Sequence, residues 1–371
     1  MNNKKQQYGV RHVAAFGVLA MGLAFISQSA LAKDYLVTAA RPDLVVVADP
    51  AERKVIKTFH IPNTSMGNSP GALAVSKNGN VAYVIHNRWE SVSGIDLESG
   101  KEVFRADLSS AGVRAKAPYA IDISPDGKEL AVFVNPTQLL PGEYRVMDPY
   151  VAIFDTSAGL QAQPVRKLNV PRRVSSLIYS PDASRLYAFS WNMLVLDPKS
   201  GKQIGEHPWR SWKREGFGEP DTLAIWPQFE QAGEFATPYY INHTGADGKT
   251  VQKAGIWSLD LVKDTVRFHE FEDASVVLFS TVINPVRRNE AYTVYTQLTK
   301  TDVDTGKLIK RIDLDHTYYT VNISSDGKEL YVGGTIDDIA VYDSQTLEKK
   351  GKIMIPGGGD QVLTSLRVVQ R

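Results

Sequence analysis

The chain has 371 residues, of which 42 are basic and 41 acidic, so its formal charge at pH 7 is +1. This near balance, without long blocks of like charge, argues against nucleic acid or an anionic membrane as a binding partner. The sequence contains no cysteine, which excludes disulfides, cysteine-ligated clusters, thiol catalysis and covalent attachment of a c-type haem to this chain.

The first 32 residues have the features of a cleaved secretory signal peptide. Lys4, Lys5 and Arg11 precede an apolar run over 13–26, and Ala30-Leu31-Ala32 forms an A-x-A cleavage site. The run is short for a membrane span, which makes a membrane anchor the weaker alternative. We expect cleavage and export, leaving a chain with 39 basic and 41 acidic residues and no further apolar stretch long enough to span a membrane.

Residues 33–371 repeat a pattern of four short strands. Runs of β-branched and aromatic residues alternate with turn residues, as in an antiparallel meander. The unit over 321–355 is the most regular, with an Asp326-Gly327 turn after its first strand. The clearest marker of the repeat is an aspartate that closes the third strand of each unit, and it occurs as Asp49, Asp96, Asp155, Asp197, Asp260, Asp302 and Asp343.

A second marker follows the first strand of most units. It reads VSKNGN, ISPDGK, YSPDAS, a degenerate INPVRR, and ISSDGK, starting at Val75, Ile123, Tyr179, Ile283 and Ile323. Seven such units predict an all-β, seven-bladed β-propeller with four-stranded antiparallel blades around a central channel. An α-solenoid is disfavoured because no sustained helical period occurs. The fifth unit, near 223–226, lacks the Asp-Gly turn and fits the repeat least well.

The two ends of the repeat region predict how the ring closes. The first unit begins with Tyr35-Leu36-Val37, which matches a second strand, so it lacks an inner strand of its own. A last strand, expected over 362–369, follows the seventh unit and has no blade. We expect it to complete the first blade as the inner strand, which removes an edge prone to aggregation. Residues 33–371 are therefore predicted to be a single domain.

Three insertions interrupt the repeat, and irregular segments on a regular scaffold are where binding residues tend to lie. The first, over 136–149, lengthens the connection between the second and third strands of the third unit. The second, over 205–220, joins the fourth and fifth units and is rich in aromatic and cationic residues. The third, over 242–252, reads as a polar excursion within the fifth unit.

The candidate interface or pocket-rim residues share a position in the repeat. They lie in connections between blades or in turns after second strands, and these two classes of loop share one face of a propeller. Aromatic residues and arginine also anchor protein interfaces. The set comprises Asn68, Arg88, Trp89, Tyr119, Arg172, Trp191, Trp209, Arg210, Trp212, Tyr318 and Tyr319, with the adjacent Pro118 and Arg173. The alternative for each is a role in blade packing or in lining the channel.

The histidines give no local metal motif. The seven of them, at positions 12, 60, 86, 207, 243, 269 and 316, form none of the spacings H-x-H, H-x-x-x-H or H-E-x-x-H. Propeller loops can bring distant ligands together over the channel, so a metal-dependent propeller hydrolase remains an alternative.

Two longer segments resemble one family. The opening KDYLVTAARPDLVVVADPAERKVIKTFHIP and the segment VAYVIHNRWESVSGIDLESGKEVFRADLS, with the cysteine-free repeat, are similar to the beta subunit of quinohemoprotein amine dehydrogenase, a YVTN-type seven-bladed propeller. The likeness covers essentially all of residues 33–371. It implies a subunit of a periplasmic heterotrimer that oxidises primary amines to aldehydes and ammonia.

The resemblance also implies a division of roles among three subunits. The alpha subunit of the family is a dihaem cytochrome c, and the gamma subunit carries cysteine tryptophylquinone and the catalytic carboxylate. The beta propeller supports the gamma subunit and helps to wall the substrate pocket. We therefore expect no catalytic residue, cofactor or metal in this chain. The alternative is a free-standing periplasmic propeller that binds a small ligand or a protein partner.

Overall fold

The structure, a computed structural model, describes residues 32–62, 70–361 and 366–371. Residues Lys33–Arg371 form one compact unit, which contains all of the described strands. The predicted signal peptide up to residue 31, Asn68 and the start of the predicted closing strand lie outside the described residues. No helix in the described part of the chain is long and apolar enough to cross a membrane.

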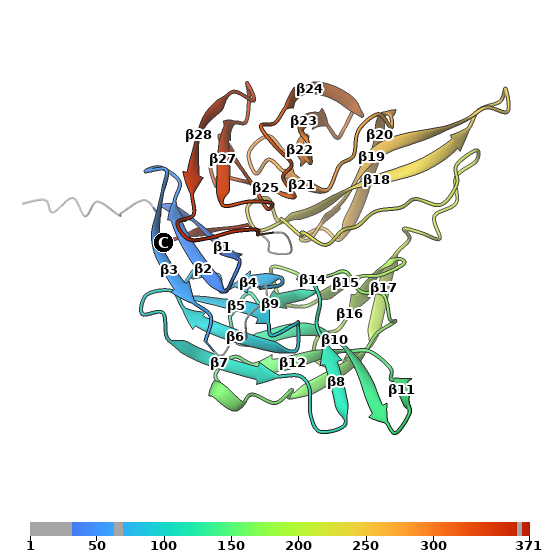
Figure 1. The fold of residues 1–371 in the computed structure, drawn as a ribbon. Helices are drawn as coiled ribbons and strands as arrows, with labels where there is room; N and C mark the ends of the chain where they lie inside the picture. The colour runs from blue at the N-terminus through green and yellow to red at the C-terminus, as the bar shows by residue number, and fades with distance from the viewer. Residues whose placement is uncertain (1–31, 63–69, 362–365) are drawn as a thin grey trace, which may run out of the picture. The chain divides into compact units, whose positions relative to one another are not determined.

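The described strands form seven antiparallel sheets, which are the blades of a β-propeller (Figure 1). The predicted fold is confirmed. Blade 1 comprises β29 (Arg367–Gln370), β1 (Asp34–Ala40), β2 (Leu44–Asp49) and β3 (Lys54–His60). Blade 2 comprises β4 (Leu73–Val75), β5 (Val81–His86), β6 (Ser91–Asp96) and β7 (Glu102–Asp107). Blade 4 comprises β14 (Ser176–Tyr179), β15 (Leu186–Phe189), β16 (Met193–Leu196) and β17 (Gln203–His207). Blade 6 comprises β21 (Ser280–Ile283), β22 (Glu290–Val294), β23 (Gln297–Asp302) and β24 (Lys307–Asp313). Blade 7 comprises β25 (Thr320–Ile323), β26 (Glu329–Gly333), β27 (Asp338–Asp343) and β28 (Lys349–Met354).

Blades 3 and 5 depart from four strands. Blade 3 contains β9 (Ile121–Ile123), β10 (Glu129–Leu140), β12 (Tyr150–Asp155) and β13 (Arg166–Asn169), with β8 (Val113–Lys116) and β11 (Glu143–Val146) added on the extended β10. A short 3-10 helix, η1 (Gly159–Gln161), follows β12. Blade 5 contains β18 (Glu234–Thr244), β19 (Thr250–Asp260) and β20 (Thr265–Asp273).

Blade 1 closes the ring by combining strands from both ends of the propeller. β29 pairs with β1 in antiparallel register, with Tyr35 opposite Val369. Leu36 of this blade is buried in one apolar cluster with Tyr331 of blade 7. The predicted closure is confirmed, and the strand runs to Gln370, one residue beyond its predicted end.

Blade 5 has three strands in the described chain, so the prediction of four strands in every blade is wrong here. The stretch 223–226 stands in the chain where an inner strand would be, yet it is not a strand. Ala224 has a φ of 46°, a left-handed conformation that interrupts an extended strand. Pro227 then follows with no N–H to donate to a ladder. The carbonyl of Ala224 instead accepts a hydrogen bond from the Ser176 hydroxyl of blade 4.

Each marker aspartate stabilises the turn that follows the third strand of its blade. In blade 6 a carboxylate oxygen of Asp302 accepts the backbone N–H groups of Asp304 at 3.0 Å and Thr305 at 2.9 Å. All seven markers accept the N–H two residues further on. These Asx turns explain why aspartate recurs at this position.

The inner strands are edge strands, so one row of their backbone groups has no ladder partner. Side chains of neighbouring blades form hydrogen bonds with some of these backbone groups. Ser280 of blade 6 accepts the Val321 N–H of blade 7 at 2.9 Å, and Asp122 of blade 3 accepts the Tyr179 N–H of blade 4 at 2.7 Å. Adjacent blades are therefore joined by hydrogen bonds between inner strands as well as by apolar packing.

The three insertions form strands or lie along strands. Residues 136–149 extend β10 and return as β11. Residues 242–252, expected as a polar excursion, are the end of the long β18–β19 hairpin, which projects beyond its blade in Figure 1. Residues 205–220 include the end of β17 and then run beside β18, where Phe217 forms a bridge with His243.

Candidate functional site

The two ends of the propeller channel carry different chemistry. The inner strands begin at one end of the channel, which we call the entry end. They finish at the other end, which we call the exit end. Because the strands are antiparallel, second strands finish at the entry end and connections between blades return there. Every described residue of the candidate set precedes a first strand or follows a second or fourth strand. The set therefore lies at the entry end.

Trp191 lies between two arginines at the entry end of blade 4. The guanidinium carbons of Arg173 and Arg210 lie 4.4 Å and 4.7 Å from its ring centroid. Trp191 is nevertheless 49% exposed, and Arg210 is held by Glu219 at 3.0 Å. The arrangement is an exposed aromatic and cationic surface fixed by neighbouring side chains.

Trp209 packs in the core, as in the blade-packing alternative for this candidate. It is 2% exposed, and its ring packs against Phe189, Tyr239 and Trp257 at centroid distances of 5.8, 5.4 and 5.8 Å. Trp212 packs beside it, with its ring 4.0 Å from Phe268 of the outer strand of blade 5. The aromatic character of this insertion thus serves the packing between blades 4 and 5.

Tyr318 and Tyr319, which are adjacent at the entry end of blade 7, have different roles. Tyr318 is fully buried, and its hydroxyl donates to Asp338 at 3.3 Å. It is therefore a core residue rather than a rim residue. Tyr319 is half-buried in a ring cluster that the sequence did not reveal, which comprises Trp226, Phe279, Tyr295 and Tyr319 with centroid distances of 4.2–6.1 Å.

The remaining candidates occupy the entry ends of blades 2 and 3. Trp89 is half-buried with its ring 6.3 Å from that of Tyr119, and Pro118 precedes this tyrosine in the chain. Arg88 is exposed, in a turn where both it and Trp89 have positive φ. Arg172 donates to the Met147 carbonyl at 2.7 Å, so it ties the blade 3 insertion to the next connection.

The hairpin of β10 and β11 exposes an apolar face that the sequence did not single out. Leu139 stands opposite Tyr144 in the register, and Val146 lies two residues further along the same face. Tyr144 is 78% and Val146 63% exposed. We call Leu139, Tyr144, Val146, Arg173, Trp191 and Arg210 the entry patch.

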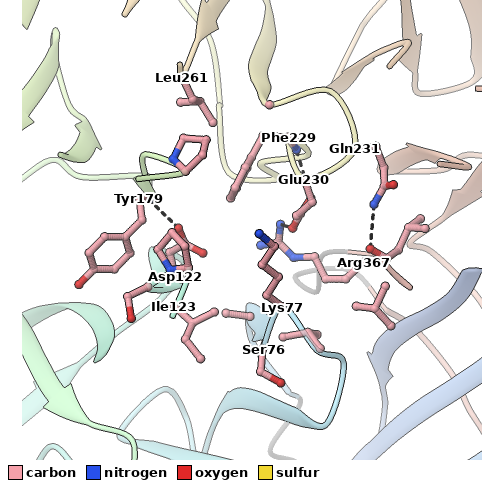
Figure 2. Close-up of a pocket in the computed structure, with 18 of the residues that line it drawn as sticks. Ser76, Lys77, Asp122, Ile123, Tyr179, Phe229, Glu230, Gln231, Leu261 and Arg367 are labelled. Carbon is pink, nitrogen blue, oxygen red and sulfur yellow. Dashed lines mark hydrogen bonds and ion pairs between the residues drawn. The ribbon is translucent and has the colours of Figure 1, made fainter. Parts of the chain in front are cut away.

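A cavity of about 270 Å³ lies at the exit end (Figure 2). It is bordered by the ends of inner strands β4, β9, β14 and β29 and by the segment that replaces an inner strand in blade 5. Its apolar wall includes Ile123, Phe229 and Leu261, and its polar side chains include Lys77, Asp122, Glu230 and Arg367. The sequence analysis placed no candidate residue here.

Arg367 holds one side of this exit cavity together. Its guanidinium donates to the Leu73 carbonyl at 3.2 Å, to the Pro227 carbonyl at 2.8 Å, and to the Glu230 carboxylate. The side chain is 3% exposed. One arginine on the closing strand therefore links blade 1 to blade 2 and to the segment before blade 5.

Asp122 lies on the other side of the cavity and is only 6% exposed. Burial raises the pKa of its carboxyl to about 7, even though the Tyr179 N–H and Arg367 act in the opposite direction. In the matching position other units have Ala74, Ile178 or Asn322. A carboxylate among apolar neighbours in a first strand was the sequence signal for this cavity.

Replacing Asp122 by asparagine is expected to stabilise the protein at pH 8 and to leave it nearly unchanged at pH 4. The native carboxyl binds its proton more tightly than the unfolded one, so Asp122 lowers stability as pH rises from about 4 to about 7. Each unit of this shift corresponds to about 1.4 kcal/mol. Asparagine keeps the oxygen that accepts the Tyr179 N–H and removes the charge.

Urea titrations of both proteins at pH 4, 6 and 8 measure this effect. An Asp182→Asn variant is the control, because its hydrogen bonds lower that carboxyl's pKa to about 2 and it should lose stability at pH 8. Equal pH dependence of Asp122→Asn and the parent protein would show that Asp122 has an ordinary pKa.

One buried chain of polar groups resembles a hydrolase triad in composition only. His86 Nε2 lies 2.7 Å from the Ser93 hydroxyl, which donates to Glu102 at 2.5 Å. The serine lies between the other two groups, and burial lowers the pKa of His86 to about 4. Ser93 and His86 are both fully buried, so these groups have a structural role. Among the described residues, no cluster of three or more His, Asp or Glu side chains could hold a metal.

The chain is similar to several solved structures at low sequence identity. A hydrazine synthase chain of Kuenenia stuttgartiensis is 15% identical with a TM-score of 0.54, over 82% of this chain and 90% of that chain. Apo AztD of Citrobacter koseri is 14% identical with a TM-score of 0.51, over 92% and 99% of the two chains. A protein of unknown function from Desulfotomaculum acetoxidans is 9% identical with a TM-score of 0.58, over 91% and 99%. These likenesses show the propeller fold. No protein-family model matches the sequence, and no curated protein matches it.

Proposed function

We propose that this chain is the propeller subunit of a periplasmic quinohemoprotein amine dehydrogenase. The observation that carries the proposal is the entry patch, because exposed apolar and arginine-flanked aromatic side chains on ordered hairpins are typical of a docking surface. The resemblance of the opening and second-blade segments to the beta subunit supplies the family. The hydrazine synthase chain among the structural neighbours gives a further case of this fold in an enzyme of nitrogen compounds.

The entry patch is suited to a rigid protein partner. Arg172 fastens the base of the blade 3 hairpin to the connection that carries Arg173, and Arg173 lies over Trp191. Contacts within the chain therefore connect the segments of blades 3 and 4 that carry the patch. A preformed surface of this kind loses little conformational entropy when a partner binds.

The role of the chain in catalysis is to hold and shield a partner. The resemblance implies that the gamma subunit would supply the quinone for amine oxidation and the alpha subunit the haems. This chain has no cysteine, so it cannot form cysteine tryptophylquinone or attach a c-type haem. Its entry end would position the gamma subunit, close one wall of the amine pocket and exclude bulk water from the reacting quinone.

Affinity purification of the chain from the periplasm of its source cells tests the proposal. The expected product is a complex that contains a haem subunit and a quinone subunit in equal amounts and oxidises primary amines. Recovery of a lone chain, while amine dehydrogenase activity elutes elsewhere, would reject it.

The triple variant Y144S/V146S/W191S is expected to reduce recovery of the partners at least tenfold and to leave folding unchanged. These side chains are exposed, so their replacement removes contact area for a partner and little internal packing. The matched control is L160S/V262S/V286S, which changes three exposed apolar residues in exit-end turns. Equal partner recovery from both variants would move the docking surface away from the entry patch.

A further inference from the structure

The exit cavity contains a buried carboxylate, Asp122, that has no ion-pair partner among the described residues. One oxygen of Asp122 accepts the Tyr179 N–H at 2.7 Å, and no described residue forms an ion pair with this carboxylate. Figure 2 shows Asp122 and the Arg367–Glu230 pair at the same cavity. The Ile123 N–H also stabilises the charged form. A buried carboxylate that has backbone donors but no ion-pair partner is unfavourable for folding, and such groups are common at ligand sites.

Arg367 offsets this charge only in part, because it acts on Asp122 without an ion pair between them. Arg367 is directed to Glu230 and to the carbonyls of Leu73 and Pro227, which use its donors. Lys77 is exposed at the cavity. Asp122 is therefore the buried carboxylate of the cavity that is left for a cationic ligand, since Glu230 is already paired with Arg367.

The remaining walls decide what kind of cation fits. Ile123, Phe229, Leu261 and Val368 are apolar, and the Ser76 and Ser124 hydroxyls, which also border the cavity, already bond within their own turns. A hard metal ion prefers six or more oxygen ligands, whereas an alkylammonium needs one carboxylate and an apolar surface. We propose that the exit cavity binds a small organic cation, an alkylammonium whose N–H groups donate to Asp122 and whose carbon chain packs on the apolar wall.

This site is independent of the proposed function. It lies at the opposite end of the inner strands from the entry patch, so a partner docked on the entry patch would leave it open. Its volume of about 270 Å³ is just below the usual range of drug-sized pockets, about 300–1,000 Å³. The cavity therefore fits a short-chain amine better than a bulky one.

Isothermal titration of the purified protein with n-butylammonium chloride at pH 8 tests the site. We expect binding by the parent protein and at least tenfold weaker binding by Asp122→Asn, which corresponds to about 1.4 kcal/mol. Asparagine keeps the Tyr179 hydrogen bond, so this variant should remain folded. n-Butanol, which has the same chain and no charge, is expected to bind at least tenfold more weakly than n-butylammonium.

A second variant predicts an effect of opposite sign. Lys77→Met removes a positive charge from the cavity lining, so n-butylammonium should bind two- to fivefold more tightly. Equal affinity of the parent protein, Asp122→Asn and Lys77→Met would overturn the proposal. So would tighter binding by Asp122→Asn together with weaker binding by Lys77→Met, which would indicate an anion site. These results come from the isolated chain and say nothing of partner recovery, so either proposal can fail alone.

Discussion

Replacing Arg367 by methionine is expected to lower the free energy of unfolding by about 2–4 kcal/mol, because two carbonyl groups of buried residues lose a hydrogen-bond donor. Methionine fills much of the same space, so the loss comes from polar groups that stay buried. The Glu230 carboxylate and the carbonyls of Leu73 and Pro227 would each lose their donor. Urea denaturation at pH 7, followed by tryptophan fluorescence, measures the change.

Two further variants isolate the cause of the Arg367 effect. Combining Arg367→Met with Glu230→Gln should recover little stability, because the Glu230 side chain is 31% exposed and water can solvate its unpaired carboxylate. Arg172→Met is the control for loss of an exposed arginine, and it should change stability by less than about 0.5 kcal/mol. If Arg367→Met behaves like Arg172→Met, the closing strand is held by packing alone.

The second large effect is expected at Trp209. Changing it to alanine should cost about 3–5 kcal/mol, as for other buried tryptophans, because Phe189, Tyr239 and Trp257 would face a cavity. Trp191→Ala should stay within about 0.5 kcal/mol of the parent protein, because its ring is half exposed. Thermal and urea unfolding of both variants give the comparison.

Recovery of partner proteins should depend on Trp191 more than on Trp209, which is the reverse of their effects on stability. Trp191→Ala should reduce it while the chain stays folded, whereas Trp209→Ala should reduce it only as far as the amount of folded chain falls. A stable Trp209→Ala protein that fails to recover partners would place Trp209 in the interface after all.

The repeat could be read from the sequence because its markers have local causes. Each marker aspartate forms a turn with residues two or three positions away, so the need for it recurs in every blade. Closure was visible as a missing first strand at one end of the repeat and an extra strand at the other. Blade 5 was misread because its inner segment lost both the turn and the strand, with Ala224 and Pro227 in its place.

The site was harder to read because exposure depends on contacts between blades. Trp191 and Trp209 are the same residue type in similar loops, yet one is exposed and the other is enclosed by aromatic rings of blades 4 and 5. Tyr318 and Tyr319 are adjacent in the chain and only Tyr318 is fully buried. Asp122 could have been identified from the sequence as a charged residue in an apolar strand. Its cavity could not, because it is formed by strands that lie hundreds of residues apart in the chain.

The pairing of β1 with β29 has a consequence for biogenesis. Val37 pairs with Arg367, so the first blade has no inner strand until the last strand of the propeller has emerged. A growing chain therefore presents β1 as an unpaired strand edge. A long loop must also close before the final contacts form, which slows folding. The ring should accordingly fold as a whole, since a chain that has not reached Arg367 is still an open ring.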